Sequence, residues 1–145
     1  MITGFLGYIN RQWLRGETDH LTRYGGKGTW ALVTGATDGI GLEFCRQLAK
    51  DGFKVCLISR TESKLKDAVE SLKGFGVETR IIIANFSNNA DMAFYSKIEE
   101  KIKDLDIGLC VINAGVCHAD YIDRVPTNLL QEMIDVNTYH VGALL

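Results

Sequence analysis

The sequence lacks a long hydrophobic run. No apolar stretch in its 145 residues approaches the roughly 18 residues that predict a transmembrane helix. The amino end also lacks the continuous apolar core of a secretory signal. The composition, 46% hydrophobic and 23% charged, is typical of a globular protein and excludes disorder or a fibre as an overall description. We therefore expect one soluble domain with its own core.

The sequence also has little excess charge of one sign and no paired cysteine motif. The formal net charge is -2, and no run of like charges predicts a nucleic-acid partner. Four cysteines (Cys45, Cys56, Cys110 and Cys117) form no Cys-x-x-Cys pair. They are expected to be small buried thiols in a reducing intracellular compartment. The three histidines have no ligand-like spacing with them, so no metal site is predicted.

Residues 1–28 form an arm that differs in pattern from the rest of the chain. Ile2, Leu6, Ile9 and Trp13 recur at helical spacing, with polar and cationic residues on the other side. This pattern predicts a short amphipathic helix. Such a helix would anchor the protein to a membrane surface or a partner, and a mitochondrial targeting segment shares the composition. The pattern is equally compatible with an arm that folds back onto its own domain.

The central feature is a glycine-rich turn that follows an apolar run. Residues 30–33 predict a buried strand, and Gly35, Gly39 and Gly41 precede a helical pattern. Glycines allow sharp turning and close approach to a ligand, and the helix N-terminus favours an anion. A strand, such a turn and a helix indicate a site for the pyrophosphate of a dinucleotide.

Strand and helix patterns alternate four times after residue 29. In the first helix we expect a buried stripe of Ile40, Phe44, Leu48 and Ala49. Further strands are expected at 54–59, 78–84 and 107–112, and further helices at 62–72, 91–103 and from Pro126 to the end. This alternation predicts an α/β fold, a Rossmann-like doubly wound parallel sheet of about four strands in the order 3-2-1-4, over residues 29–145. The ligand crevice would lie at the carboxyl ends of strands 1 and 4.

The turn, read together with Asn113-Ala114-Gly115 after the fourth strand, resembles the short-chain dehydrogenase/reductase family. That family combines Thr-Gly-x-x-x-Gly-Ile-Gly with a later Asn-Ala-Gly. The resemblance covers residues 27–145. In its finer details the sequence is similar to the branch of very-long-chain 3-oxoacyl-CoA reductases and 17β-hydroxysteroid dehydrogenases. Members of that branch usually use NADPH and attach to membranes, which here implies the endoplasmic reticulum or mitochondria.

Single residues refine the expected cofactor. Arg60 lies at the end of the second strand, where an NAD site would hold a carboxylate, so it predicts binding of the NADP 2′-phosphate. The alternative interpretation of Arg60 is a solvated cation of the loop. Asp38 stands where some NADP-binding relatives carry a basic residue. The resemblance places Asn85 against the adenine amino group, in the place of an aspartate. The predicted cofactor contacts are Thr34, Gly35, Thr37, Asp38, Gly39, Ile40, Gly41, Arg60, Asn85, Asn113, Ala114 and Gly115.

The catalytic signature of the family, Tyr-x-x-x-Lys, is missing. None of the five tyrosines is followed by a lysine four residues later. Asn137 matches a family asparagine that holds a water in the proton relay, although it could equally be a polar residue satisfied inside a helix packing. In the family, the tyrosine and lysine lie on elements that would follow Leu145.

Three functions are compatible with these residues. We favour a non-catalytic, NADP(H)-binding half-domain that acts as a structural or regulatory subunit, its strand 4 edge and C-terminal helix covered by other chains. The second is the N-terminal portion of an active NADPH-dependent 3-oxoacyl-CoA or hydroxysteroid oxidoreductase, completed by further sequence or by a partner. The third uses the fold for protein contacts only, with no nucleotide.

Overall fold

The computed structural model describes residues 19–87 and 91–144. The amphipathic helix predicted near the amino end falls on residues outside this part of the chain. Within it, no helix combines the length and the hydropathy needed to cross a bilayer.

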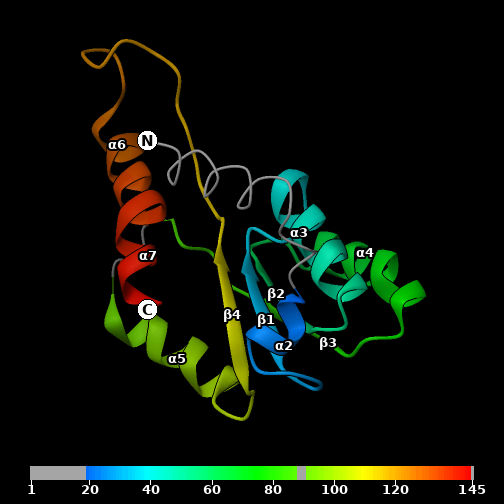
Figure 1. The fold of residues 1–145 in the computed structure, drawn as a ribbon. Helices are drawn as coiled ribbons and strands as arrows, with labels where there is room; N and C mark the ends of the chain where they lie inside the picture. The colour runs from blue at the N-terminus through cyan, green and yellow to red at the C-terminus, as the bar shows by residue number, and fades with distance from the viewer. Residues whose placement is uncertain (1–18, 88–90, 145) are drawn as a thin grey trace, which may run out of the picture.

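A four-stranded parallel sheet forms the centre of the molecule (Figure 1). Its strands run in the order β3-β2-β1-β4, as the sequence predicts. Their bounds are β1 (Trp30–Thr34), β2 (Lys54–Ser59), β3 (Thr79–Ile83) and β4 (Ile107–Ile112). The inner strands are apolar along almost their whole length because helices cover both faces. In the register, Thr34 at the end of β1 lies between Ile58 and Ile112, so the three strands finish at one edge.

Helices cover the two faces separately (Figure 1). One face carries α3 and α4, and the other carries α5, α6, η3 and α7. The helical bounds are α2 (His20–Arg23), α3 (Gly39–Lys50), α4 (Glu62–Leu72), η2 (Lys73–Phe75), α5 (Met92–Ile102), α6 (Thr127–Ile134), η3 (Asp135–Tyr139) and α7 (His140–Ala143). Three layers of this kind are the doubly wound arrangement of a Rossmann-like domain.

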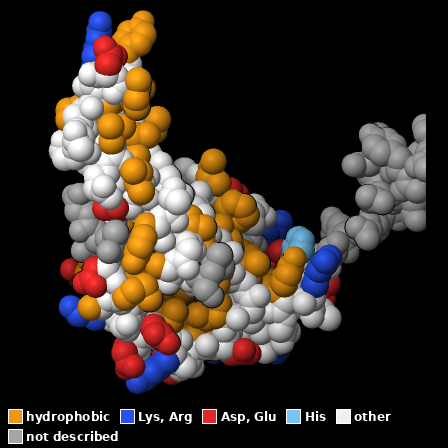
Figure 2. All heavy atoms as spheres, turned by 90° about the vertical axis from the view of Figure 1, so that its left-hand side faces the viewer, with side chains coloured by type: hydrophobic (Ala, Val, Ile, Leu, Met, Phe, Trp, Pro, Cys, Tyr) orange, Lys and Arg blue, Asp and Glu red, His pale blue; other side chains and the backbone are white. Residues whose placement is uncertain are grey.

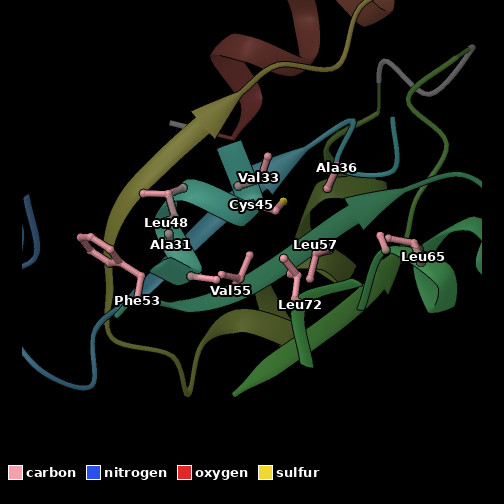
Figure 3. Packing of buried hydrophobic residues seen from close by; sticks show 12 residues of the cluster. Ala31, Val33, Ala36, Cys45, Leu48, Phe53, Val55, Leu57, Leu65 and Leu72 are labelled. Carbon is pink, nitrogen blue, oxygen red and sulfur yellow. The ribbon is translucent and has the colours of Figure 1, made fainter. Parts of the chain in front are cut away.

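Alternate residues of each inner strand contribute to two cores. Ala31, Val33, Val55 and Leu57 pack with α3 and α4, as the close view in Figure 3 shows. Their sequence neighbours, among them Leu32 and Cys56, pack with α5 and the C-terminal helical segment. Successive side chains of a strand point to opposite faces, so an uninterrupted apolar run serves both cores.

The buried stripe of α3 differs from the predicted one. Ile40 is 70% exposed and Phe44 is 45% exposed, whereas Leu48 is buried as expected. Gly41 and Cys45 face the sheet instead. Small residues one turn apart allow the start of this helix to approach the end of β1 closely, and the larger pair is turned toward solvent. A helical period fits two adjacent stripes here, and the requirement for close approach selects the small one.

The prediction of four buried cysteines is half wrong. Cys45 and Cys56 are buried, but Cys110 and Cys117 are exposed. Cys110 lies on β4, which in the described sheet is an edge strand paired with β1 and is covered less than an inner strand. Cys117 lies in the loop that follows β4. Burial raises the pKa of Cys45 and of Cys56 to about 12, so these two thiols stay protonated.

The C-terminal helix runs without a break from Thr127 to Ala143, as the pattern starting at Pro126 predicts. It consists of α6, one turn of π-helix in η3, and α7. Hydrophobic side chains reach the surface on the side that carries α5, α6 and α7 (Figure 2). Ile134 on α6 is 55% exposed, and Tyr121 and Ile122 in the preceding loop are 70% and 76% exposed.

Candidate nucleotide-binding site

The glycine turn joins β1 to α3 at the carboxyl edge of the sheet. Gly35 has a φ of +64°, a conformation that favours glycine. A Cβ on Gly41 would lie 2.2 Å from the Gly35 carbonyl oxygen, so the turn closes only with glycine there. Asp38 caps α3, because its carboxylate accepts a hydrogen bond from the Gly39 N–H at 2.7 Å. These contacts hold an open turn in front of a helix N-terminus.

Thr34 connects the ends of β1 and β4. Its hydroxyl oxygen accepts hydrogen bonds from the backbone N–H groups of Asn113 and Ala114, both at 3.0 Å. The Asn113 amide donates in return to the carbonyl oxygens of Thr34 and Gly35, at 3.3 and 3.4 Å. Thr34 and Asn113 therefore shape the crevice from behind.

His140 on α7 lies behind Thr34 and is fully buried. Its Nδ1–H donates to the Val136 carbonyl oxygen, so Nε2 can accept from the Thr34 hydroxyl at 3.5 Å. Its ring lies 4.5 Å from that of Phe86, centroid to centroid. Burial lowers the pKa of His140, because desolvation disfavours the cation. The histidine is therefore a neutral link between α7, β1 and the crevice wall.

Cations gather where β2 meets α4. Arg60 follows the last residue of β2, Lys64 lies in the first turn of α4, and both line the same cavity. Neither forms an ion pair with a carboxylate within the described part of the chain. Beside them, the hydroxyls of Ser59 and Thr37 lie 3.1 Å apart and tie β2 to the glycine turn. This end of the crevice therefore presents two cations to an incoming anion.

The loop after β3 forms the opposite wall. The Asn85 side-chain oxygen accepts a hydrogen bond from the Ser87 N–H at 3.2 Å, which folds the loop into an Asx turn. The Ser87 hydroxyl donates to Glu132 on α6 at 2.7 Å. Phe86 is buried between His140 and Tyr95, and its ring stacks on the tyrosine at 6.3 Å.

Asn137 lies in η3 and binds the loop after β4. Its side-chain oxygen accepts from the Val116 N–H at 2.9 Å, and its amide donates to the Val116 carbonyl oxygen at 2.8 Å. The side chain is thus paired with loop backbone, and the residue itself is exposed. A relay role for Asn137 stays a prediction.

These walls enclose a cavity of about 280 Å³. Seven of the predicted cofactor residues line it: Gly35, Thr37, Asp38, Arg60, Asn85, Ala114 and Gly115. Thr34, Gly41 and Asn113 support it from behind through the contacts above. Gly39 and Ile40 lie elsewhere, at an apolar hollow on the outer side of α3 with Phe44. Cofactor contacts for all of these residues stay predictions.

The cavity also contains residues that no sequence pattern identified. They are Thr61, Lys64, Ala84, Phe86, Ser87, Val116 and Val136, together with Ser59 beside Arg60. Lys64 could have been found, since it lies in the first turn of the helix that follows Arg60. Ser59 ends β2, and the others come from loops and from η3, where no period predicts which side chains meet. Over residues 19–87 and 91–144, no cluster of three or more His, Cys, Asp or Glu side chains could hold a metal ion.

The chain belongs to the short-chain dehydrogenase family. The family model described as short chain dehydrogenase matches residues 29–142, most of the chain, in agreement with the resemblance of the two glycine-containing motifs. The sequence is 41% identical over 123 residues to a very-long-chain 3-oxoacyl-CoA reductase of Podospora anserina, covering 81% of this chain and 36% of that protein. It is also 41% identical over 127 residues to hydroxysteroid dehydrogenase-like protein 1 of Gallus gallus, covering 86% and 37%.

Solved structures agree with this assignment. A study of 7beta-hydroxysteroid dehydrogenase provides a structure with a TM-score of 0.75 at 28% identity, covering 86% of this chain and 48% of that one. An alcohol dehydrogenase from Thermococcus sibiricus, complexed with 5-hydroxy-NADP, gives 0.69 at 31% identity, covering 81% and 50%. The chain thus spans about half the length of these structures and less of the curated relatives. The matched half contains the glycine turn and the crevice.

Proposed function

We propose that this chain binds NADP(H) and serves as the cofactor-binding half of a short-chain oxidoreductase. The observation that carries the proposal is the cavity, which has an open glycine turn at one side and the cations Arg60 and Lys64 at another. The T. sibiricus enzyme, 31% identical, is complexed with an NADP analogue. The L-sorbose reductase of Gluconobacter frateurii, 25% identical with a TM-score of 0.72, is complexed with NADPH.

Each part of the cavity suits one part of the cofactor. The turn at Gly35 and Thr37, at the N-terminus of α3, suits the pyrophosphate, because free N–H groups and the helix dipole favour an anion. The Arg60 and Lys64 side chains suit the 2′-phosphate that distinguishes NADP from NAD. Asn85 lines the wall where adenine is expected. When bound, the nicotinamide would supply the hydride; these residues bind and orient the cofactor.

Reduction of a carbonyl also needs a proton donor, which these residues do not supply. The Tyr-x-x-x-Lys pair of the family is absent from the 145 residues. In this proposal the pair comes from further sequence or from a partner chain. The relatives suggest the substrate class, a 3-oxoacyl thioester or a steroid carbonyl, since they are named as a very-long-chain 3-oxoacyl-CoA reductase and a hydroxysteroid dehydrogenase-like protein.

A second candidate function is that of a non-catalytic subunit that retains the cofactor. Apolar side chains on the α6 side of the molecule favour it, among them Ile134 and Ile122, together with the unpaired outer edge of β4 in the described sheet. Such surfaces are typical of contacts with other chains. In this function the chain would be incorporated tightly into an assembly without turnover. Reductase activity of the purified chain would contradict it.

Equilibrium titration with NADPH and NADH tests the cofactor proposal. We expect NADPH to bind at least tenfold more tightly, because charge-assisted hydrogen bonds to a phosphate contribute about 1.5–3 kcal/mol. Arg60→Ala and Lys64→Ala should each reduce this preference and leave NADH binding nearly unchanged. Arg46→Ala, which removes an exposed cation of α3 paired with Glu43, is the matched control. Equal affinity for both cofactors would contradict the role of the cations, and no binding of either would refute the proposal.

A further inference from the structure

Glu132 joins three separate parts of the chain beside the cavity. One carboxylate oxygen accepts the Ser87 hydroxyl at 2.7 Å, and the other lies 3.1 Å from His118 Nε2. Because a carboxylate only accepts hydrogen bonds, Nε2 carries the proton in this contact. The three residues come from the loop after β3, from α6 and from the loop after β4. We call this set, Ser87, Glu132 and His118, the clasp.

The clasp acts directly on the wall of the cavity. Ser87 lines the cavity, and its backbone N–H donates to the Asn85 side-chain oxygen. Glu132 does not line the cavity itself, and its side chain is only 18% exposed. A largely buried carboxylate with both oxygens bonded is held in one place, since leaving either oxygen unpaired costs free energy. Its position therefore fixes the Ser87 side of the wall.

We propose that Glu132 is a positioning residue for the adenosine end of the cavity, which holds the Asn85 turn in its binding conformation through Ser87. The inference rests on the proposed binding of NADP(H). Phe86 anchors the same loop on its apolar side, against Tyr95 and His140. The clasp supplies the polar anchor on the other side, so the loop is fixed from two directions.

The negative charge of Glu132 also affects this end of the cavity. Hydrogen bonds from Ser87 and His118, together with the positive charge of Arg60, lower the pKa of Glu132, so the side chain is an anion at neutral pH. This anion attracts Arg60 as a phosphate ligand would, so it competes with the ligand for the cation and repels the ligand. Removal of the charge and loss of the geometry are therefore expected to change affinity in opposite directions, and the test must separate them.

Two substitutions make that separation. Glu132→Gln keeps an oxygen that accepts from Ser87 but removes the charge, whereas Glu132→Ala removes both. The probe is 2′,5′-ADP, which carries the adenosine and the 2′-phosphate without the nicotinamide, titrated calorimetrically into the full chain. We expect Glu132→Ala to bind it roughly tenfold more weakly than Glu132→Gln, which corresponds to about 1.4 kcal/mol. Glu132→Gln should bind it at least as tightly as the unaltered protein.

Control substitutions test whether a change in 2′,5′-ADP affinity reflects only a general loss of structure. Gln131→Ala removes a hydrogen bond to Asp135 on the next turn and should leave 2′,5′-ADP affinity unchanged. Ser87→Ala removes the same contact from the other side, so it should weaken binding similarly and add little to Glu132→Ala. It also keeps the proposal testable if Glu132→Ala does not fold. Equal affinities for Glu132→Ala and Glu132→Gln, or full additivity of the pair, would overturn the proposal.

A measurement without ligand separates this inference from the proposed function. Hydrogen exchange of the Ser87 amide, which donates to Asn85, should accelerate at least tenfold in Glu132→Ala and stay slow in Glu132→Gln. Exchange at Leu57 in the core of β2 is the internal reference. Unchanged exchange at Ser87 refutes the clasp even where 2′,5′-ADP binds. Slow exchange with no binding of 2′,5′-ADP to the unaltered protein refutes the proposed function instead.

Discussion

Among the glycines of the turn, Gly41 is the one whose replacement by alanine is expected to destabilise the protein most. A Cβ there would lie 2.2 Å from the Gly35 carbonyl oxygen and 2.6 Å from the Asn113 amide nitrogen. Contacts below 3.0 Å essentially never occur for a Cβ. One obstructing group is backbone, so the turn and the start of α3 must separate by about 0.8 Å.

The cost of Gly41→Ala follows from that displacement. Overpacking of a close contact costs about 1–3 kcal/mol. Moving Asn113 also weakens its two hydrogen bonds to the turn, each of which contributes about 0.5–1.5 kcal/mol. We expect the free energy of unfolding to fall by about 2–4 kcal/mol, although alanine is the better helix former.

Urea denaturation followed by circular dichroism measures the effect, with Gly142→Ala as the control. Gly142 lies in α7, and a Cβ at this position would meet no atom within 4 Å, so alanine there should be neutral or slightly stabilising. A Gly41→Ala protein within about 0.5 kcal/mol of the unaltered one would refute the argument that close packing, rather than ligand contact alone, requires glycine at this position.

Three further expectations concern other parts of the chain. The pKa of His140 is lowered by burial, so the unfolded state binds its proton first; stability should fall as the pH drops below the ordinary histidine pKa of about 6.5. A His140→Gln protein should show a shallower pH dependence by denaturant titration, and an unchanged one would contradict this. A thiol reagent should modify Cys117 and Cys110 in the native protein and reach Cys45 and Cys56 only on unfolding, because the latter are buried with pKa values of about 12; four fast thiols would refute it. The 145-residue chain should co-sediment with anionic vesicles and a chain without residues 1–18 should not, and equal sedimentation of both would contradict a membrane role for the arm.

Much of the fold could be predicted because local signals agree with one another. The strands at 54–59 and 107–112 and the helix at 62–72 have the observed bounds, since each apolar pattern ends at a turn residue or a glycine. The strand order followed from the alternation of elements and from the family resemblance. The outward position of Ile40 could not be predicted, because periodicity alone does not distinguish two adjacent stripes of α3.

The site was predictable only where its residues are linked by short spacing. Gly35, Thr37 and Asp38 belong to one turn, and Arg60 follows a strand end, so the sequence identifies them. Glu132 meets Ser87 across 45 positions, and His140 meets Thr34 across 106. Contacts at such separations depend on how the helices pack on the sheet, which no spacing in the sequence reports.

These long-range contacts concern ligand binding and not the chemical step. Every wall of the cavity is fixed by hydrogen bonds within the described chain: Thr34 with Asn113, Thr37 with Ser59, Asn137 with Val116, and Ser87 with Glu132. A site held this way loses little conformational freedom when a ligand enters, which favours binding. None of these contacts includes a tyrosine that could act as the proton donor of the family. The described residues therefore organise this cavity through their own contacts.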